Sequence, residues 1–203
     1  MDRDVAERRE QQRSADVPRR KNDPLGVRGR ILDAAFDLFQ SQGYNATSVH
    51  HIAAAARVTG GALHHHFPTK KALALAVVGE RVAAAVEEVW IEPMQSAANA
   101  REAILSILDG LAEELDAQGS VRGCPVNNLT LELAFADADF RAELRRLFER
   151  WRAAIAAKLG SAKDSAALAT TVVAAYSGAM AIAKVEQRGE PLRLCAKEIE
   201  KLL

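Results

Sequence analysis

The sequence predicts an all-α protein in which a small N-terminal helical domain precedes a larger helical domain. Of the 203 residues, 49% are apolar and only 6 are proline. Alanine, the strongest helix former, is abundant, and long runs of the β-branched residues that favour strands do not occur. Because a chain of this length can bury a substantial core, we expect about nine helices packed around it.

Residues 1–25 are predicted to form a flexible charged arm. Acidic and basic residues alternate there and large apolar side chains are almost absent, so burial cannot offset the entropy lost on ordering. Arg19, Arg20 and Lys21 could contact phosphate, although the interspersed acids favour a solvated tail. The arm has no apolar core like that of a signal peptide, and we expect no membrane-spanning stretch elsewhere. These features predict a cytoplasmic protein.

A first helix is expected to begin near Arg28. From there, apolar residues recur on one helical face, at Ile31, Ala35, Leu38 and Phe39. Gly43 stands where a left-handed residue commonly ends a helix, and Tyr44 would then fall back onto Phe39. The helix should therefore end at this glycine.

Two short helices joined by a tight turn should follow. Thr47 is expected to cap the first of them and Thr59 the second. The second should end at Phe67, because a residue before proline is pushed out of the helical region. Thr69 then caps a long helix that is predicted to end just before Pro93.

The rest of the chain is also predicted to be helical, with glycines at the breaks. The expected helices lie at about 98–117, 125–135, 138–159, 163–188 and 190–203. Cys124 and Cys195 are far apart in a chain expected to be intracellular, so a structural disulfide is not expected. Each cysteine is predicted to be a small buried hydrophobe.

Charge is divided unevenly between the two parts of the chain. Residues 1–71 hold twelve Lys and Arg against eight Asp and Glu, whereas residues 72–203 hold fifteen against nineteen. The front is therefore basic although the formal net charge is zero. Three short helices, with a tight turn between the second and third, also form the helix-turn-helix that reads the major groove of DNA.

Candidate DNA contacts gather at the starts of the third and fourth helices. A first turn poor in side chains would let the backbone approach DNA closely, exposed histidines would follow it, and lysines would lie within reach of phosphate. The residues concerned are Thr59, Gly60, Gly61, Ala62, His64, His65, Lys70 and Lys71.

Residues 30–73 resemble the DNA-binding domain of the TetR family of repressors nearly position for position. The matching features are the ILDAAFDLF helix face, the GYNATS step, the IAAAARV run, and GALHHHF followed by TKK. The resemblance implies that Thr47 and Ser48 lie near phosphate and that Leu63 and Phe67 are core residues. It also implies that Gly61 lies at the crowded start of the helix, that Ala62, His64 and His65 face bases or backbone, and that Lys70 contacts phosphate.

The chain departs from the usual TetR pattern at two of these positions. His64 stands where tyrosine is usual, which changes the hydrogen-bond chemistry offered to DNA. Arg57 stands where glycine is common, so a non-glycine residue would be forced into a left-handed conformation, at a cost of about 1 kcal/mol or more.

The GCPVNNLTLELAF segment and the W-x-x-x-I segment resemble one effector-domain subgroup of the family. By this resemblance, a cavity is expected between the long fourth helix and the helices at 98–159. The candidate lining residues are Trp90, Met94, Cys124, Asn127, Asn128, Leu131, Phe135, Phe148, Trp151 and Tyr176. Aromatic side chains at helical spacing also fit an ordinary core. Cys124 could in addition sense an electrophile, if the following helix N-terminus stabilised its thiolate.

The last two helices resemble the four-helix dimer interface of the family. Small residues on the helix at 163–188 would allow close packing with a second copy, and the final helix would add apolar side chains. The candidates are Ala166, Ala169, Val173, Gly178, Ala181, Leu192 and Ile199. The same residues also fit the domain's own core, because apolar helices look alike in either setting.

These observations predict a ligand-responsive transcriptional regulator, a repressor that binds a palindromic operator as a homodimer and is released by a small-molecule effector. Residues 26–72 would bind DNA, and residues 73–203 would bind the effector and form the dimer. Activation instead of repression stays open, as does a helical dimeric adaptor that does not bind DNA.

A His-dependent enzyme is the remaining alternative. All 5 histidines lie between residues 50 and 66. Adjacent helical residues point about 100° apart and do not easily share one ion, so we expect no metal and no cofactor. The sequence also lacks a nucleophile elbow, a phosphate-cradling glycine loop and an HExxH motif. We therefore expect a protein that is not an enzyme.

Overall fold

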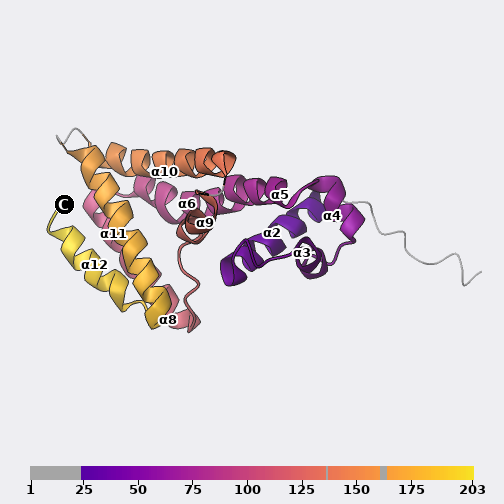
Figure 1. The fold of residues 1–203 in the computed structure, drawn as a ribbon. Helices are drawn as coiled ribbons and strands as arrows, with labels where there is room; N and C mark the ends of the chain where they lie inside the picture. Colours follow the sequence, from indigo (N-terminus) through magenta and orange to yellow (C-terminus); the bar gives the residue numbers. More distant parts are fainter. Residues whose placement is uncertain (1–23, 136, 161–163) are drawn as a thin grey trace, which may run out of the picture.

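The computed structural model describes residues 24–135, 137–160 and 164–203, and all the regular secondary structure in these ranges is helical (Figure 1). Three helices form the N-terminal domain: α2 (Pro24–Gln42), α3 (Val49–Ala55) and α4 (Gly60–His66). The predicted arm lies outside the described residues except for its last two, which already belong to α2. The first helix thus begins four residues earlier than expected.

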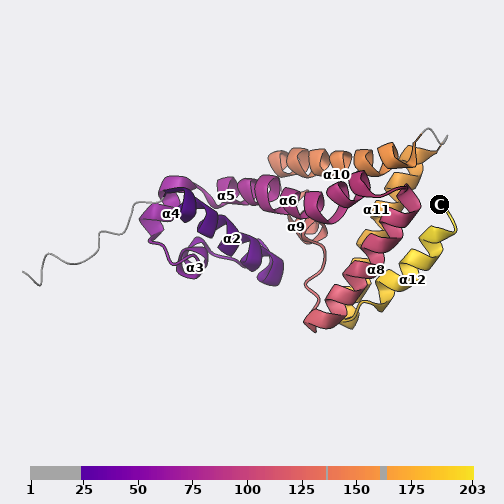
Figure 2. The same cartoon turned by 180° about the vertical axis from the view of Figure 1, so that it is seen from behind.

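A long helical rod leads from this domain into the rest of the molecule (Figure 2). It comprises α5 (Lys70–Ala76), η1 (Val77–Val82), α6 (Ala83–Val86), η2 (Glu87–Ile91) and α7 (Glu92–Ser96), where η1 and η2 are π-helical. Pro93 was expected to close this helix, but it lies near the start of α7, and the rod ends only at Ser96. Proline is tolerated there because the widened turn before it relaxes the normal backbone pattern.

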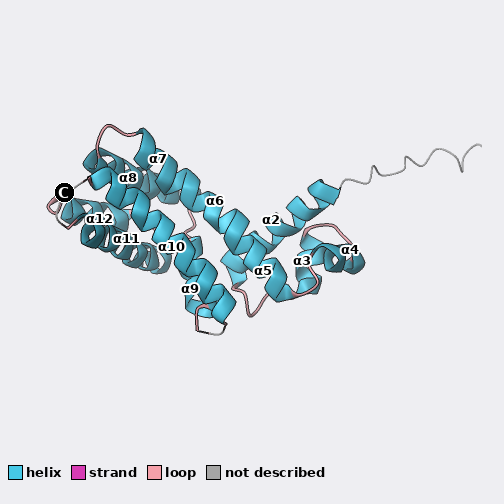
Figure 3. Cartoon of the chain, turned by 90° about the horizontal axis from the view of Figure 1, so that it is seen from above, coloured by secondary structure: helices cyan, strands magenta, loops and turns pink. Residues whose placement is uncertain are grey.

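The C-terminal part packs four longer helices and one short helix around the end of the rod. They are α8 (Ala100–Gln118), α9 (Pro125–Leu133), α10 (Ala138–Leu159), α11 (Ser165–Glu186) and α12 (Glu190–Glu200). With the rod counted as one, nine helices occur in the described part of the chain. Helix α10 runs beside the rod, and α9 lies where α10, η1 and α2 meet (Figure 3).

Local sequence explains most helix starts. Thr59 caps α4 by accepting a hydrogen bond from the Ala62 backbone N–H at 3.1 Å, and Thr69 caps α5 in the same way, as predicted. The cap of α3 was predicted one residue too early. Ser48 accepts from the backbone N–H of His51, whereas the side chain of Thr47 turns inward.

One helix pair is held by a very close approach. Gly189 is the N-cap residue of α12, and a Cβ atom there would overlap the backbone carbonyl of Ala112 in α8. The Asp116 carboxylate accepts from the Gly189 backbone N–H at 2.7 Å and from the Arg193 guanidinium at 2.6 Å. These contacts fix α8 and α12 against each other.

The expectation that no stretch is long and apolar enough to span a membrane was wrong for α11. The most apolar 18-residue stretch of this 22-residue helix has a mean hydropathy of 1.6, and 39% of that stretch is buried. By length and composition alone this helix could span a membrane, but helices in the cores of other proteins have the same length and composition. Its apolar character therefore extends onto the exposed surface of the protomer.

Candidate DNA-binding surface and effector cavity

The exposed surface of α4 starts with glycines that the fold itself does not require. A Cβ atom on Gly60 would meet nothing within 4 Å, and one on Gly61 would approach only the Thr59 hydroxyl, at 4.0 Å. Both glycines, Thr59, His64 and His65 are exposed, and Ala62 is half-buried. The predicted contact residues of α4 thus share one open face, while Leu63 and Phe67 are buried, as expected.

The turn between α3 and α4 contains the strained residue that the sequence predicted. Arg57 has a φ of 54°, in the left-handed region where glycine is favoured. Its backbone N–H donates to the Ala54 carbonyl, and the Val58 N–H donates to the Ala53 carbonyl at 3.0 Å, so hydrogen bonds tie both residues of the turn back to α3. The conformation is held by these bonds and by the packing of the two helices.

Thr47 does not have the exposure that a phosphate contact needs. Its side chain is 1% exposed, and its hydroxyl donates to the Gly43 carbonyl at 2.7 Å. The preceding turn, where Gly43 has a φ of 85°, draws this hydroxyl inward. Of the two residues expected near phosphate, only Ser48 has an exposed side chain.

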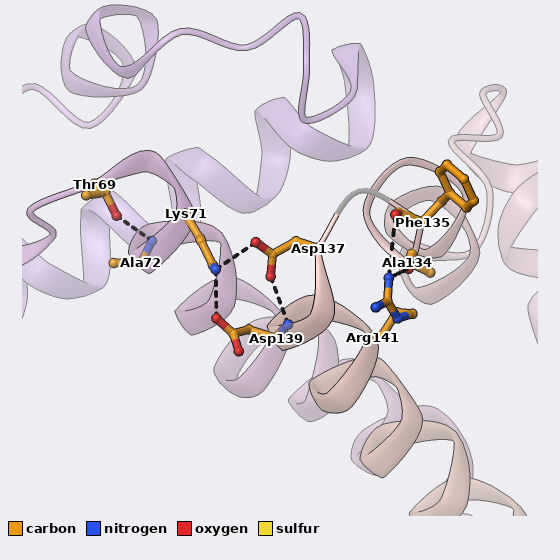
Figure 4. A network of polar contacts seen from close by, with 8 residues as sticks. All are labelled: Thr69, Lys71, Ala72, Ala134, Phe135, Asp137, Asp139 and Arg141. Carbon is orange, nitrogen blue, oxygen red and sulfur yellow. Dashed lines mark hydrogen bonds and ion pairs between the residues drawn. The ribbon is translucent and has the colours of Figure 1, made fainter.

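The two lysines at the start of α5 both contact other groups of the protein, and Figure 4 shows the contacts of Lys71. Lys71 lies 2.7 Å from both the Asp137 and Asp139 carboxylates, whose hydrogen bonds raise the pKa of its ammonium group. Lys70 lies over the Tyr44 ring, 4.2 Å from its centroid, and partial burial lowers the pKa of Lys70. The sequence assigned both lysines to DNA phosphate, but they link α5 to the start of α10 and to the turn after α2.

Arg141 of α10 holds the end of α9 in place. Its guanidinium donates to the carbonyl of Ala134 at 3.1 Å and to that of Phe135 at 3.5 Å (Figure 4). The Asp137 carboxylate caps α10 by accepting from the Asp139 backbone N–H at 2.8 Å. The end of α9 and the start of α10 therefore lie together as a polar corner against α5.

A contact that sequence reasoning missed joins α9 to the N-terminal domain. The Glu132 carboxylate accepts from the Tyr44 backbone N–H at 3.1 Å and from the Asn45 N–H at 2.9 Å. A Cβ atom on Gly43 would lie 2.5 Å from the same carboxylate. The partners are 88 and 87 residues apart in the chain, so no local pattern could have indicated the contact.

Both asparagines near the start of α9 serve packing rather than the cavity. Asn128 donates to the Gln40 side chain at 2.8 Å and to the Arg122 carbonyl at 2.9 Å, and accepts from Lys184 at 3.1 Å. Asn127 donates to the Ser177 carbonyl at 3.2 Å. Neither residue lines the cavity, and both tie α9 to its neighbours.

A mostly apolar cavity of about 190 Å³ lies between the rod, α8, α9, α10 and α11. Four of its lining residues were predicted: Trp90, Cys124, Trp151 and Tyr176. The others are Val82, Ala85, Val86, Val89, Leu111, Glu114, Leu115, Gly123, Pro125, Val126 and Met180. Trp90 and Tyr176 meet edge to face, with ring centroids 5.0 Å apart, and Trp151 packs against both.

The other predicted lining residues lie elsewhere. Leu131 is 85% exposed and Phe135 is 96% exposed, because both point away from the bundle at the outer side of α9 and its end. Met94 is buried in the core without lining the cavity. Phe148 stacks on Trp151 from an outer groove between α10 and α11.

Cys124 faces the cavity as a protonated thiol. Burial raises its pKa, against the opposing influence of the Asn127 and Val126 backbone N–H groups. Burial likewise raises the pKa of the neighbouring Tyr176 hydroxyl well above its usual range. The thiolate that electrophile sensing would need is therefore disfavoured, and the structure does not support that hypothesis.

The predicted dimer residues divide into two groups. Ala169, Val173, Leu192 and Ile199 are buried in the protomer's own core, so these side chains do not face a second copy. Ala166, Gly178 and Ala181 are exposed. They belong to an exposed stripe of α11 that consists of Ala166, Ala167, Thr170, Thr171, Ala174, Gly178, Ala181, Ile182 and Val185.

Within the described residues, no three His, Cys, Asp or Glu side chains come together as metal ligands would. His65 and His66 make an edge contact with ring centroids 5.4 Å apart. His50, His51, His64 and His65 are exposed. The arrangement offers imidazoles to the exterior around α3 and α4.

Two families match the two parts of the chain. Residues 31–77 match the bacterial regulatory proteins of the tetR family, and residues 100–198 match the C-terminal domain of LmrA/YxaF-like transcriptional regulators. These are families of transcriptional regulators rather than of enzymes.

Two curated relatives extend over most of the chain. The HTH-type transcriptional regulator YxaF of Bacillus subtilis (strain 168) is 31% identical over 181 residues, which cover 87% of this chain and 94% of YxaF. The HTH-type transcriptional repressor DhaR of Mycobacterium sp. (strain GP1) is 28% identical over 182 residues, covering 82% and 86%.

Solved structures show the same fold. The regulatory protein TetR from Rhodobacter sphaeroides has a TM-score of 0.77 at 26% identity, covering 85% of this chain and 96% of that one. The reduced form of NemR from E. coli has a TM-score of 0.78 at 21% identity, covering 86% and 95%. The all-helical arrangement, with its N-terminal helix-turn-helix, is thus that of these regulators.

Proposed function

Because the chain belongs to the TetR family of bacterial transcriptional regulators, we propose that it is a cytoplasmic repressor that binds a palindromic operator as a homodimer. A small molecule in the cavity would release it from DNA. Residues 26–72 would form the DNA-binding domain, and residues 73–203 the effector-binding and dimerisation domain. The relative DhaR is itself named a repressor.

The open face of α4 supports the assignment of the recognition helix. Its first turn has exposed backbone at Gly60 and Gly61, and His64 and His65 follow on the same exposed side. Ser48 and Thr59 would add hydroxyl contacts to phosphate. Lys70 and Lys71 would reach phosphate only after leaving Tyr44 and the two aspartates.

The course of α9 is the observation that carries the proposed release. Cys124, Pro125 and Val126 at its start line the cavity, and Glu132 near its end holds the backbone of Tyr44 and Asn45. A ligand that moved the start of α9 would therefore shift the turn that precedes α3. Because α9 contacts both the cavity and the DNA-binding domain, ligand binding in the cavity could change the affinity for DNA through this helix.

The exposed stripe of α11 supports the homodimer. It carries no charged side chain and is made mostly of small residues, with the larger apolar Ile182 52% exposed and Val185 84% exposed at one end. A second copy packed on this stripe would remove that surface from water, and two-fold symmetry would present two α4 helices to a palindrome.

Selection from random-sequence DNA duplexes tests the proposed operator. The enriched sequences should be inverted repeats with half-sites about 10 base pairs apart, centre to centre, or a multiple of that spacing. Binding should weaken steeply between about 50 and 200 mM salt. Failure to enrich any sequence, or enrichment of a single asymmetric half-site, would contradict the proposal.

A substitution that fills the cavity tests whether occupation of the cavity releases the protein from its operator. Ala85→Phe should put a ring into the cavity and weaken operator binding by about tenfold, the size of a typical coupling free energy. In a Glu132→Ala background, which lacks the contact between α9 and the turn, the same substitution should have less than half that effect on the free energy of binding. Equal losses in both backgrounds would show that α9 does not carry the coupling.

A further inference from the structure

The cavity contains hydrogen-bond donors that the protein leaves unused. Trp90 is 2% exposed and Trp151 is 0% exposed, and neither indole Nε1 makes a hydrogen bond of normal geometry to a described residue; the Tyr176 hydroxyl lies near the Trp90 N–H, which acts to lower the pKa of that hydroxyl. Buried polar groups are normally paired, so each unpaired donor needs an explanation. Because both tryptophans line the same cavity, a ligand that brings acceptors would explain both.

The remaining lining limits the charge of such a ligand. No Lys, Arg or His occurs among the residues described as lining the cavity, so an anion would find no countercharge there. Glu114 is the lone carboxylate among them, and it is exposed and accepts a hydrogen bond from Gln118 at 2.6 Å. The Cys124 thiol and Tyr176 hydroxyl stay protonated, because burial raises both pKa values.

The aromatic rings also leave little room for a cation. Trp90, Trp151 and Tyr176 lie within 5.0 to 5.6 Å of one another, centroid to centroid, so their faces and edges are used on each other. A cation site needs an open ring face. A cavity of about 190 Å³ further restricts the ligand to about the size of a substituted single ring.

We propose that the cavity binds a compact, neutral, mostly apolar molecule whose carbonyl or ether oxygen accepts hydrogen bonds from the Trp90 and Trp151 indole N–H groups. This ligand class rests on the proposed function, because the cavity is taken to be the effector site. Trp90 lies in the π-helical segment η2, and such segments are frequent at functional sites.

Two probes of nearly equal size and shape test the acceptor. Acetophenone carries a ketone oxygen, and ethylbenzene does not. Calorimetry on the full chain without DNA should show acetophenone binding about tenfold more tightly than ethylbenzene, the value of a buried hydrogen bond. The chain has only 2 tryptophans, so their emission maximum should shift with the same ligand dependence. Benzoate and phenyltrimethylammonium should bind more weakly than acetophenone.

Substitution of the donors makes the test specific. Trp90→Phe and Trp151→Phe each keep a buried ring but remove an N–H, so one or both should lower acetophenone affinity by about threefold to tenfold. Ethylbenzene affinity should stay within about twofold in both variants, and this also shows that the cavity is intact. Met94→Leu, at a buried residue outside the cavity, should leave both probes unchanged.

Three results would overturn the ligand class: equal affinities for the two neutral probes in the unmodified chain, tighter binding of a charged probe, or no binding of acetophenone at all. Acetophenone that binds through the indoles without changing operator affinity would support the ligand class and contradict the proposed function. The two proposals therefore fail on different measurements.

Discussion

Glycine is used for opposite reasons at the start of α4 and at the junction between α2 and α9. At the junction the chain itself demands glycine, because Gly43 has a φ of 85° and a Cβ atom there would lie 2.5 Å from Glu132. At α4 nothing in the protein demands it, since a Cβ on Gly60 would meet no atom within 4 Å. Glycine loses more conformational entropy on folding than any other residue, so glycines at a helix start that internal packing does not require indicate a constraint from outside the chain.

Gly178 on α11 resembles the glycines of α4 in this respect. It is exposed, and a Cβ atom there would meet nothing within 4 Å. Glycines that internal packing does not explain thus occur on both proposed contact surfaces, one for DNA and one for a second copy. Gly110, on the exposed side of α8, has equally open surroundings and lies on neither surface, so it serves as a control.

The largest effect is expected from Gly61→Leu. A leucine side chain at the start of α4 would hold the helix away from DNA, so operator affinity should fall at least about a hundredfold, or about 2.8 kcal/mol. The free energy of unfolding should not fall, because leucine favours helix over glycine. Fluorescence anisotropy on the selected operator and urea denaturation measure the two quantities. Gly110→Leu should change neither operator affinity nor the free energy of unfolding by much. If Gly61→Leu lowered the free energy of unfolding, the fold itself would require Gly61 as it requires Gly43, and the contrast between α4 and the junction would not hold.

Gly178→Arg should have the next largest effect, on assembly. A large charged side chain in the centre of the exposed α11 stripe would have to be desolvated on dimerisation, so we expect at least about a tenfold weaker dimer. Light scattering coupled to gel filtration should show a mass near one protomer at micromolar concentration. Gly110→Arg should remain dimeric, and an unchanged mass for Gly178→Arg would place the dimer contact elsewhere.

The sequence was most informative where the interactions are local. The caps at Thr59 and Thr69, the left-handed Gly43 and the strained Arg57 depend on neighbours within a few residues. The Thr47 prediction failed by one position, because a cap and its neighbour have the same chemistry and differ only in orientation. Leu131 and Phe135 were misplaced because periodicity cannot say which apolar face of α9 is covered. Glu132 and Asn128 bind partners 56 or more residues away, and only the bond from Asn128 to the Arg122 carbonyl is local.

Gly43→Ala should be destabilising without touching DNA. Alanine would adopt the left-handed conformation at a cost of about 1–2 kcal/mol, and its methyl group would press on Glu132. Urea denaturation should show this loss, and the same substitution in a Glu132→Ala background should lose less, since only the conformational part remains. Equal losses of unfolding free energy in both backgrounds would mean that the Glu132 side chain moves away from the methyl group at no cost. The junction would then be less constrained than its geometry indicates.

The smallest effect is expected at the polar corner beside the junction. The Lys71 hydrogen bond lowers the pKa of Asp137, so its stabilising contribution is complete above about pH 3.9, the ordinary aspartate value, and is lost as the pH falls through the lower folded-state value. Asp137→Asn keeps a side chain able to cap α10 but removes the charge. The difference in melting temperature between this variant and the unmodified chain should therefore shrink from pH 7 to about pH 3. Asp109→Asn changes an exposed α8 residue without an ion pair to any described residue, so the difference in melting temperature that it causes should not shrink as the pH falls. If the difference for Asp137→Asn were the same at pH 7 and at about pH 3, Lys71 would contribute nothing to the stability of the corner.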